Sequence, residues 1–458
     1  MNMNRMTTKA IMVLVLTLLL LIPLDLIDSL IEERKDRQVS ANFEVRDQWG
    51  TEQSLTGPIL RIPYRKHLED NNGFLSKTFT AYFLPDTLSV TGTISPEIRY
   101  RGIYKIVVYQ AVLNISGEFI KPDFATLEGD GIAVQWQAAV LEIGLENPRG
   151  IRQEPVLQLA GIDYKPIPTV LSSDLLSAGF HVPNLDWILE TEETKIPFSI
   201  TLKLQGSDRL NIIPVGTSTA VSLSSTWSNP SFDGAYLPVQ RTITEQGFSA
   251  HWYVSYLNRN FPPQWKTESK RGVHQTIHTA FKNSNFGITL LVPVDFYQMS
   301  TRSTKYGILF LSLTFISIIL FEVHYKLDIH PMQYLLVGLA LCLFYLLLIS
   351  LSEQVGFLLA YLIASGATIS LIGAYIHSAV KKVTVTIINF LVTASLYGYL
   401  YILLQLQDYA LLVGSIGLFM ILALVMFLTR KINWYLLIAT TVSFKNGKLS
   451  LGNEVNPG

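Results

Sequence analysis

The sequence predicts a multi-pass α-helical membrane protein with six spans, one N-terminal and five C-terminal, and a large β-rich periplasmic domain between spans one and two. Of the 458 residues, 49% are hydrophobic and 15% are charged, whereas about a quarter are charged in a typical soluble domain. Gln333–Leu351 carries no charged residue and is long enough to cross a bilayer core of about 30 Å as a helix. Between residues 28 and 304, short apolar runs alternate with polar residues, which is typical of strands.

Charge and cysteine content exclude some classes of partner. The 35 Lys and Arg residues balance the 35 Asp and Glu residues, so no net positive field indicates a nucleic-acid partner. Cys342 is the sole cysteine and lies inside an apolar run. No intramolecular disulfide is therefore possible, and cysteine content says nothing about the redox compartment.

Residues 1–9 are predicted to form a cytoplasmic N-terminus and residues 10–27 a transmembrane anchor. Ala10–Leu24 is an almost unbroken apolar run that follows Arg5 and Lys9. A cleaved signal peptide begins in the same way but ends in a site with small residues. Here the chain continues with the polar sequence DLIDSLIEERKDR, so an uncleaved anchor is favoured.

Residues 28–304 are predicted to form the β-rich periplasmic domain, as one large or two smaller lobes. Every second residue of Phe198–Leu204 is apolar, which is the period of a half-buried strand. Further strands are expected at Thr78–Phe83, Tyr104–Tyr109, Ile132–Trp136, Val221–Trp227, Trp252–Tyr256 and Phe286–Val292. Turns are expected at Asn71-Asn72-Gly73, Gly129-Asp130-Gly131 and Gly206-Ser207-Asp208. Within the domain only Ile31–Gln48 indicates a helix, as an extension of the first span.

Residues 305–430 are predicted to form a five-helix transmembrane bundle, and residues 431–458 a cytoplasmic tail. The five spans are Tyr306–Val323, Gln333–Leu351, Val355–Ile376, Val383–Leu404 and Tyr409–Leu428. The loops between them are so short that sequential helices must be antiparallel neighbours.

The distribution of basic residues predicts the orientation. Alternating the spans gathers on one side Arg5, Lys9, Lys326, Lys381, Lys382, Arg430 and Lys431. The short loops on the other side carry Glu353 and Asp408 and no Lys or Arg. Because positive residues accumulate on the cytoplasmic side, both termini are expected in the cytoplasm of a bacterial inner membrane, with the β-rich domain in the periplasm.

Two groups of titratable residues are candidates for chemistry. His274 and His278 are four residues apart, so they could share a face and ligate one metal. No acidic residue or cysteine lies between them, and a solvated pair is favoured. Glu322, His324 and His330 lie at the inner end of the second span. A proton relay would need such groups inside the membrane, whereas charge at the boundary is solvated, and this second interpretation is favoured.

Two stripes on the spans concern packing or permeation. Thr386, Asn389, Thr393 and Tyr397 share one face of the fifth span at spacings of three, four and four. This face could line a solute path or hydrogen-bond to neighbouring helices. Gly366, Ser370 and Ala374 follow one another at steps of four on the fourth span. Small residues at this spacing permit close helix approach, so we expect this stripe to pack against another helix.

Several motifs of catalysis and coupled transport are missing from the sequence. None of the last four spans has a charged residue near its middle, where ion-coupled transporters usually need one. There is no GxxxxGK[ST] motif for nucleotide phosphates and no GxSxG nucleophile motif. The sequence therefore predicts no catalytic, cofactor-binding or metal-binding residue, no cofactor, and a protein that is not an enzyme.

The chain resembles the CreD family of bacterial inner-membrane proteins. The longest matching stretch is HPMQYLLVGLALCLFYLLLISLSEQVGF (residues 330–357). Other matching motifs are TKYGILFLSLTF (304–315), RGIY (101–104), PRGI (148–151), PSFDGAYLP (230–238), GFSAHW (247–252) and TRKINWY (429–435). The resemblance extends from the first span to the end of the last.

The resemblance implies a role in cell envelope integrity and the envelope stress response, by interaction rather than catalysis. It also implies regulation by a two-component system and altered tolerance of colicins or β-lactams. The expected partners are the lipid bilayer and envelope or other inner-membrane proteins. Two alternatives stay open: a transporter or export component for a neutral or amphiphilic solute, and a membrane partner of a two-component sensor. RGIY and PSFDGAYLP are interpreted as structural corners of the β-rich domain in preference to a binding surface.

Overall fold

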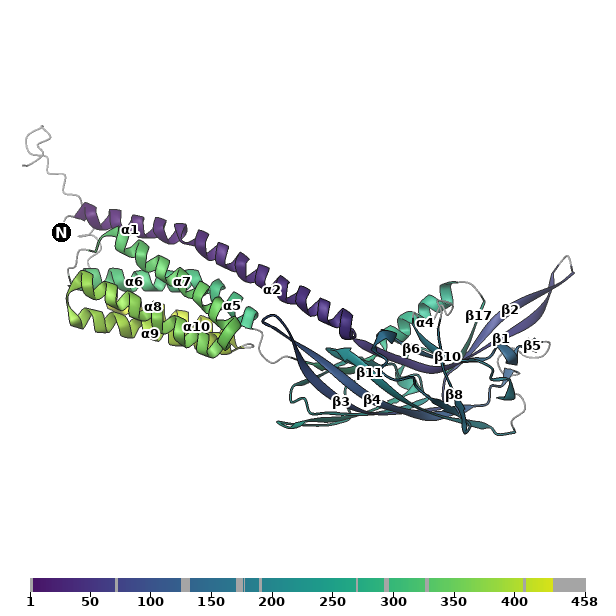
Figure 1. Ribbon diagram of the computed structural model, residues 1–458. Helices are drawn as coiled ribbons and strands as arrows, with labels where there is room; N and C mark the ends of the chain where they lie inside the picture. Colours follow the sequence, from purple (N-terminus) through teal and green to yellow (C-terminus); the bar gives the residue numbers. More distant parts are fainter. Residues whose placement is uncertain are drawn as a thin grey trace, which may run out of the picture. The chain divides into compact units, whose positions relative to one another are not determined.

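The computed structural model describes residues 3–70, 73–124, 132–169, 176, 178–188, 192–268, 271–291, 296–325, 329–406 and 409–430. The chain divides into two compact units (Figure 1). One consists of Met1–Arg37 with Asp295–Gly458, and the other of Gln38–Val294. The first unit is helical, and the second contains the β-sheets and helix α4 (Arg271–Asn283).

Six helices among the described residues are long and apolar enough to cross a membrane. The N-terminal span is made of α1 (Met3–Leu19) and α2 (Leu21–Trp49). The C-terminal spans are α6 (Gly307–Tyr325), α7 (Pro331–Val355), α8 (Phe357–Val380), α9 (Val383–Gln405) and α10 (Ala410–Thr429). A short helix, α5 (Phe296–Lys305), precedes α6. The predicted fold class, with one N-terminal and five C-terminal spans around a β-rich domain, is confirmed.

Helices α1 and α2 are interrupted only at Leu20. The interruption lies three residues before Pro23, which has no backbone N–H to donate to the preceding turn. Hydrogen bonds from Leu20 N to the Leu16 carbonyl and from Leu24 N to the Leu20 carbonyl continue across it. The predicted extension over Ile31–Gln48 is confirmed, because α2 runs on to Trp49.

Helix α7 lies at the centre of the bundle, whereas α10 lies at its margin. In the most apolar stretch of α7, more than half of the residues are buried inside the protein. In the corresponding stretch of α10, no residue is buried. Aromatic rings join the central helices. The Phe344 ring lies 4.7 Å from that of Tyr397 and 5.6 Å from that of Tyr361. The Tyr361 hydroxyl also donates to the Tyr397 carbonyl at 2.7 Å, so α7, α8 and α9 are held together at one level.

The second unit is a sandwich of two sheets. The ten-stranded sheet has the order β14-β18-β12-β1-β6-β10-β9, with β2 and β5 also on β1 and β17 on β2. Its strands are β1 (Gln53–Asp70), β2 (Gly73–Phe83), β5 (Ile132–Val134), β6 (Val140–Leu145), β9 (Ile167–Pro168), β10 (Gly179–Val182), β12 (Arg209–Ile212), β14 (Pro230–Gly234), β17 (Gln264–Glu268) and β18 (Phe286–Leu290). The β12–β1 pair is parallel.

The eight-stranded sheet has the order β15-β16-β13-β3-β4-β11-β7-β8. Its strands are β3 (Thr87–Arg101), β4 (Tyr104–Ile120), β7 (Leu157–Leu159), β8 (Ile162–Tyr164), β11 (Lys195–Ser207), β13 (Ser218–Ser225), β15 (Gln240–Thr244) and β16 (Gly247–Ser255). Short 3-10 helices are η1 (Trp136–Ala138), η2 (Pro148–Gly150), η3 (Asp186–Ile188) and η4 (Tyr256–Asn258). The β13–β3 pair is parallel, whereas β3, β4 and β11 form an antiparallel meander.

The two sheets enclose one hydrophobic core, so the sandwich is a single lobe. Ile62 and Leu141 of the ten-stranded sheet and Val90 and Leu113 of the eight-stranded sheet belong to the same buried cluster. In β11 the predicted alternation is confirmed, with Phe198, Ile200, Leu202 and Leu204 all buried. Because successive side chains of a strand point to opposite faces, the remaining side chains lie on the outer face of the eight-stranded sheet, which is open to solvent.

The other predicted strands lie in β2, β4, β5, β13, β16 and β18, but four of the predicted ends extend too far. Trp136, Trp227, Tyr256 and Leu291 fall outside strands. Of the predicted turns, Asp208 forms one, at φ 56° between β11 and β12. Gly73 begins β2, while residues 71–72 and 129–131 lie outside the described residues.

The expectation of only one helix in this region is wrong, because α4 packs onto the sandwich. Ile277 and Phe281 are buried on one face of α4, and the Phe281 ring lies 4.6 Å from that of Phe261. Only a narrow apolar face on an otherwise polar segment marks this helix, which is a weak signal in sequence.

Candidate functional site

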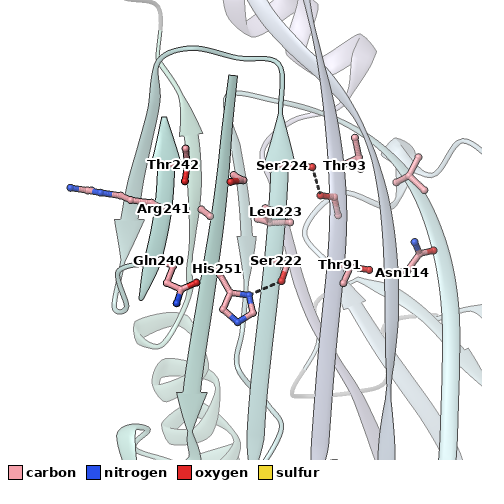
Figure 2. Close-up of a pocket in the computed structure, with 14 residues that line it drawn as sticks. Thr91, Thr93, Asn114, Ser222, Leu223, Ser224, Gln240, Arg241, Thr242 and His251 are labelled. Atoms are coloured by element: carbon pink, nitrogen blue, oxygen red, sulfur yellow. Dashed lines mark hydrogen bonds between the residues drawn. The ribbon is translucent and has the colours of Figure 1, made fainter. Parts of the chain in front are cut away.

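A polar hollow lies on the outer face of the eight-stranded sheet (Figure 2). It encloses about 580 Å³ and is formed by β3, β4, β13, β15 and β16. Its shape follows from the alternation of each strand. In β13, Val221 and Leu223 are buried while Ser222 and Ser224 are half-buried on the opposite face. The hydroxyl groups of Ser222 and Ser224 therefore face the hollow, and the side chains of Val221 and Leu223 face the core.

Strand pairing arranges these side chains in two rows that run across the sheet and continue beyond the hollow onto β11. The first row contains, in order, Gln240, His251, Ser222, Thr91, Asn114 and Thr201. The second row contains Thr242, Ser249, Ser224, Thr93, Val112 and Lys203. Directly opposed side chains on neighbouring strands lie about 5 Å apart at their Cβ atoms. The first row is thus a continuous series of amide, imidazole and hydroxyl groups, and the first four members of the second row carry hydroxyls.

Hydrogen bonds within the first row orient several of these groups. His251 Nδ1 lies 2.7 Å from Ser222 Oγ (Figure 2). At the other end, Thr201 Oγ1 donates to Asn114 Oδ1 at 2.9 Å. Asn114 is exposed, so its amide nitrogen remains available as a donor. The row therefore presents both donors and acceptors in fixed positions.

The floor of the hollow depends on Gly92, between Thr91 and Thr93. A Cβ at this position would lie 2.6 Å from the Leu113 Cδ2 atom and 2.7 Å from the Leu223 Cδ2 atom. These two leucines occupy the space on the core side of β3, so no other residue fits at position 92 without displacing them. Close packing below the strand fixes the positions of Thr91 and Thr93 above it.

Among the residues that line the hollow, the pair formed by Ser222 and His251 lacks the partners that a catalytic serine needs. A serine nucleophile needs a base, a third group that orients the base, and donors for the oxyanion. Gln240 faces His251 across the strand pair, and none of the residues that line the hollow is Asp or Glu. The backbone of β13 and β16 pairs within the sheet, so its N–H groups are not available as an oxyanion hole.

A second set of contacts fixes the last turns of α2 to the sandwich. Arg46 forms an ion pair with Asp208 in the turn between β11 and β12. The Arg99 guanidinium lies 4.5 Å from the centroid of the Trp49 ring, and Trp49 Nε1 donates to the Tyr109 carbonyl at 3.5 Å. Burial is the main cause that raises the pKa of Asp208 above its usual 3.8, although Arg46 opposes it. Burial likewise raises the pKa of Tyr109, with the charge of Asp208 next.

Two of the motifs that carry the family resemblance lie where the last turns of α2 contact the sandwich. RGIY forms the two-residue turn of the β3–β4 hairpin, with Gly102 at φ 60°. Its Arg101 pairs with Glu44 of α2 at 3.0 Å. PRGI forms η2, and its Arg149 lies 3.8 Å from Asp47 of α2. The interpretation of RGIY as a structural corner agrees with this position.

PSFDGAYLP also contributes to the internal structure of the sandwich. Its first residues form β14, where Asp233 accepts a hydrogen bond from Thr289 Oγ1 at 2.6 Å. Gly234 follows at φ 97°, and a Cβ there would lie 2.4 Å from the Asn285 carbonyl oxygen. Further on, the Tyr236 carbonyl accepts from Trp252 Nε1 at 3.2 Å. These contacts support its interpretation as a corner.

The polar stripe on α9 faces the interior of the bundle. Asn389, Thr393 and Tyr397 are 1%, 2% and 5% exposed, respectively. Both polar atoms of the Asn389 side chain and the Thr393 hydroxyl have no hydrogen-bond partner among the described residues. Thr386 is half-buried, with its hydroxyl 3.1 Å from His377 Nδ1. The stripe is therefore interior, and only part of it is used in bonding between helices.

The expectation that Glu322 is solvated at the membrane boundary is wrong. Glu322 is 3% exposed and forms an ion pair with Lys9 at 2.6 Å. The Tyr334 hydroxyl donates to the other carboxylate oxygen at 2.8 Å. Sequence could not reveal this contact, because Lys9 lies on the N-terminal span, more than 300 residues away.

The two histidines near Glu322 take no part in this cluster. His324 is exposed on the same helix. His330 is exposed and caps α7, with its Nδ1 accepting from the Met332 backbone N–H at 3.2 Å. The structure therefore separates the three residues that a relay would need to bring together.

The expected packing role of Gly366, Ser370 and Ala374 is wrong. All three are exposed on α8, and no atom lies within 4 Å of a Cβ built at Gly366. The buried small residues of this helix lie on another face and include Ala360 and Ala364. Because α8 carries small residues at steps of four on two faces, spacing alone could not choose between them.

The histidine pair proposed as a possible metal site lies on α4. His278 is exposed, and the side chain of His274 lies outside the described residues. Throughout the parts of the chain that the structure describes, no group of three or more His, Cys, Asp or Glu side chains could hold a metal ion.

Comparison with known proteins identifies the family. The family model described as "Inner membrane protein CreD" matches residues 5–435. Inner membrane protein CreD of Escherichia coli (strain K12) is 32% identical over 422 residues, which cover 91% of each chain. A mutant M1 zinc metallopeptidase of Deinococcus radiodurans covers 37% of this chain and 39% of its own, with 9% identity and a TM-score of 0.17, too low to support any conclusion. The chain belongs to the CreD family of inner membrane proteins.

Proposed function

We propose that the protein supports the integrity of the cell envelope by binding an envelope component with its β-rich domain, without catalysing a reaction. The observation that carries this proposal is the polar hollow. It has the size of a ligand site, about 580 Å³, and its side chains are oriented by hydrogen bonds. It contains hydrogen-bonding groups but no carboxylate for acid–base chemistry.

The proposal includes an orientation, with the β-rich domain of residues 28–304 in the periplasm and both termini in the cytoplasm. Lys381 and Lys382 lie at one end of α8, and Glu353 lies near its other end. Arg430 follows α10. This distribution supports the orientation through the preference of positive residues for the cytoplasmic side.

A second function, passage of a neutral solute through the bundle, is favoured by one observation. The unpartnered polar atoms of Asn389 and Thr393 lie inside the bundle, where an unsatisfied polar group costs several kcal/mol, of order ~2–7. A polar solute passing this face would satisfy them. The third alternative is a membrane partner of a two-component sensor. No feature of the described residues specifically supports it.

Two variants separate the two functions in a strain whose envelope phenotype depends on this protein. Ser224→Arg fills the hollow with a long charged side chain on an exposed strand face. The triple variant Thr386→Val, Asn389→Val and Thr393→Val removes the polar face of α9. We expect Ser224→Arg to abolish tolerance of an envelope stress such as a β-lactam, while the triple variant retains it at normal protein levels.

Thr78→Arg is the matched control, because Thr78 is exposed on β2 of the other sheet. It should behave as the unchanged protein. If the triple variant lost the phenotype at a normal level in the membrane while Ser224→Arg kept it, solute passage would replace binding as the function.

A further inference from the structure

The two rows of the hollow have nearly no charge. Of their twelve members, only His251 and Lys203 can carry one, and Lys203 lies on β11 at the end of its row. Arg241 also borders the hollow, but its guanidinium lies over the Phe232 ring at 5.9 Å, and Phe232 packs against the core residue Trp252. Exposed sheets usually carry many charged side chains, so the two rows are unusual in offering mainly hydroxyls and amides.

This chemistry excludes most classes of envelope polymer. An anionic polymer requires several Lys or Arg side chains, which the rows do not supply. A lipid requires an apolar surface, and Val112 is the one aliphatic member of the rows. A peptide in extended form pairs with the edge of a sheet and needs pockets for its apolar side chains, whereas the rows lie on the face. A ligand with many uncharged hydroxyl groups is complementary to the hydroxyl and amide side chains of the rows.

The geometry of the rows also fits a linear chain of sugar units. Neighbouring strands lie about 4.8 Å apart, and one pyranose unit of a linear glycan has a similar length. A glycan laid across the strands therefore meets one side chain from each row for each unit, and both side chains are polar except on β4, where the second row has Val112. The hydroxyl groups of a sugar both donate and accept, as do the serines and threonines of the rows.

An exposed aromatic ring lies in the next row of the same sheet face, beside the first row. Tyr253 follows His251 by two residues on β16, so both side chains lie on the same face. The Tyr253 side chain is 59% exposed, and its hydroxyl accepts a hydrogen bond from Ser218 Oγ at 3.4 Å. An exposed tyrosine offers an apolar ring with a polar tip, which suits stacking against the C–H face of a sugar.

We propose that the hollow binds an uncharged glycan, a chain of hexopyranose or N-acetylhexosamine units lying across β15, β16, β13, β3, β4 and β11. The two rows supply its hydrogen bonds, and Tyr253 stacks on a unit beside them. This inference rests on the proposed function and names the class of its ligand.

Calorimetric titration of the full chain in lipid nanodiscs tests this proposal. The probe is a hexamer of β-1,4-linked N-acetylglucosamine, and an anionic hexasaccharide serves as the comparison. We expect saturable binding of the neutral hexamer and weaker binding of the anionic one. The double variant Thr91→Val and Thr93→Val keeps the shape and strand preference of both residues but removes two hydroxyls. Its affinity should fall about tenfold or more, since each hydrogen bond is worth roughly 1 kcal/mol.

Thr78→Val is the matched control, with the same chemical change on an exposed strand of the other sheet. Its affinity should equal that of the unchanged protein. Tyr253→Ala should also weaken binding, whereas Tyr253→Phe should not. The proposal is overturned if the neutral hexamer does not bind, if the anionic one binds more tightly, or if the double variant binds as well as the control. A loss of the phenotype in Ser224→Arg without glycan binding would reject the glycan and leave the proposed function standing.

Discussion

Asp208 connects α2 to the sandwich, although both its backbone conformation and the burial of its carboxylate are energetically unfavourable. It adopts φ 56°, a left-handed conformation that aspartate tolerates better than most residues. Its carboxylate is paired with Arg46 but is largely buried, and burial raises its pKa above 3.8 despite the pair. The ion pair therefore only partly compensates for the loss of hydration, as is usual for buried pairs.

This raised pKa predicts a pH dependence of stability with a definite sign. Between 3.8 and its higher folded value, Asp208 binds more protons in the folded than in the unfolded protein. Its contribution to the free energy of unfolding is therefore fully present below pH 3.8 and is lost as pH rises through the folded pKa. Relative to Asp208→Asn, the unchanged protein should become less stable as pH rises through this window.

Thermal unfolding of both proteins in detergent, followed from pH 3.8 to neutrality, measures this difference. Arg46 is present in both, so only the titration of residue 208 differs. A difference between the two melting temperatures that stays constant, or that changes in the opposite direction, would show that burial does not control Asp208.

At the scale of elements, two ion pairs join the N-terminal span to the bundle. Lys9 pairs with Glu322 of α6, and Arg34 lies 3.8 Å from Glu353 near the end of α7. Twenty-five residues of helix separate Lys9 from Arg34, about 37 Å at 1.5 Å per residue. That length is close to the thickness of a bilayer with its interfaces, so the span is held to the bundle near both of its membrane boundaries.

Removing one partner of the ion pair between Lys9 and Glu322 should destabilise the protein more than replacing both partners. Lys9→Met leaves a buried carboxylate without its counter-charge, which costs roughly 3–5 kcal/mol. Replacing both partners, with Lys9→Met and Glu322→Met, removes the charges together and should recover most of that loss. A double-mutant cycle of unfolding in detergent measures the coupling between them. Additive losses would mean that the two side chains do not interact in the folded protein.

Glycine positions in the bundle provide a matched test of helix packing. A Cβ at Gly338 of α7 would lie 2.2 Å from Leu20 Cδ1 and 2.9 Å from Phe315 Cζ, whereas Gly366 of α8 is open. Gly338→Ala should therefore lower the melting temperature through overpacking of roughly 1–3 kcal/mol. Gly366→Ala should be neutral or slightly stabilising, because alanine favours helix. An equal decrease in melting temperature at both sites would indicate that Gly366 lies in a packed interface.

These elements also show what the sequence can and cannot predict. The spans were predictable because the hydrocarbon interior requires about 20 apolar residues in succession, as in α7. The alternation in β11 was predictable because one face is buried. Strand order was not, since residues that meet in the first row, such as Thr91, Ser222 and His251, are up to 160 positions apart. The hydroxyls of the hollow are ordinary strand residues until pairing brings them together.

At the scale of the whole molecule, the proposed orientation predicts where reporter fusions are active. Alkaline phosphatase folds only after export to an oxidising compartment. A fusion after Asp208, in the β-rich domain, should be active, and one after Lys382, between α8 and α9, should be inactive. Enzyme activity normalised to fusion protein level is the measurement. Activity in the reverse pattern would place the β-rich domain in the cytoplasm and overturn the proposed function with it.

In the proposed function, the protein contacts the envelope through the hollow of its β-rich domain. The most direct test places a photoreactive amino acid at Ser224 in intact cells and identifies what is joined to it on illumination. The same amino acid at Thr78, exposed on the other sheet, is the control. We expect an adduct that contains envelope glycan at position 224 and not at position 78. No adduct at 224, or the same adducts at both positions, would contradict it.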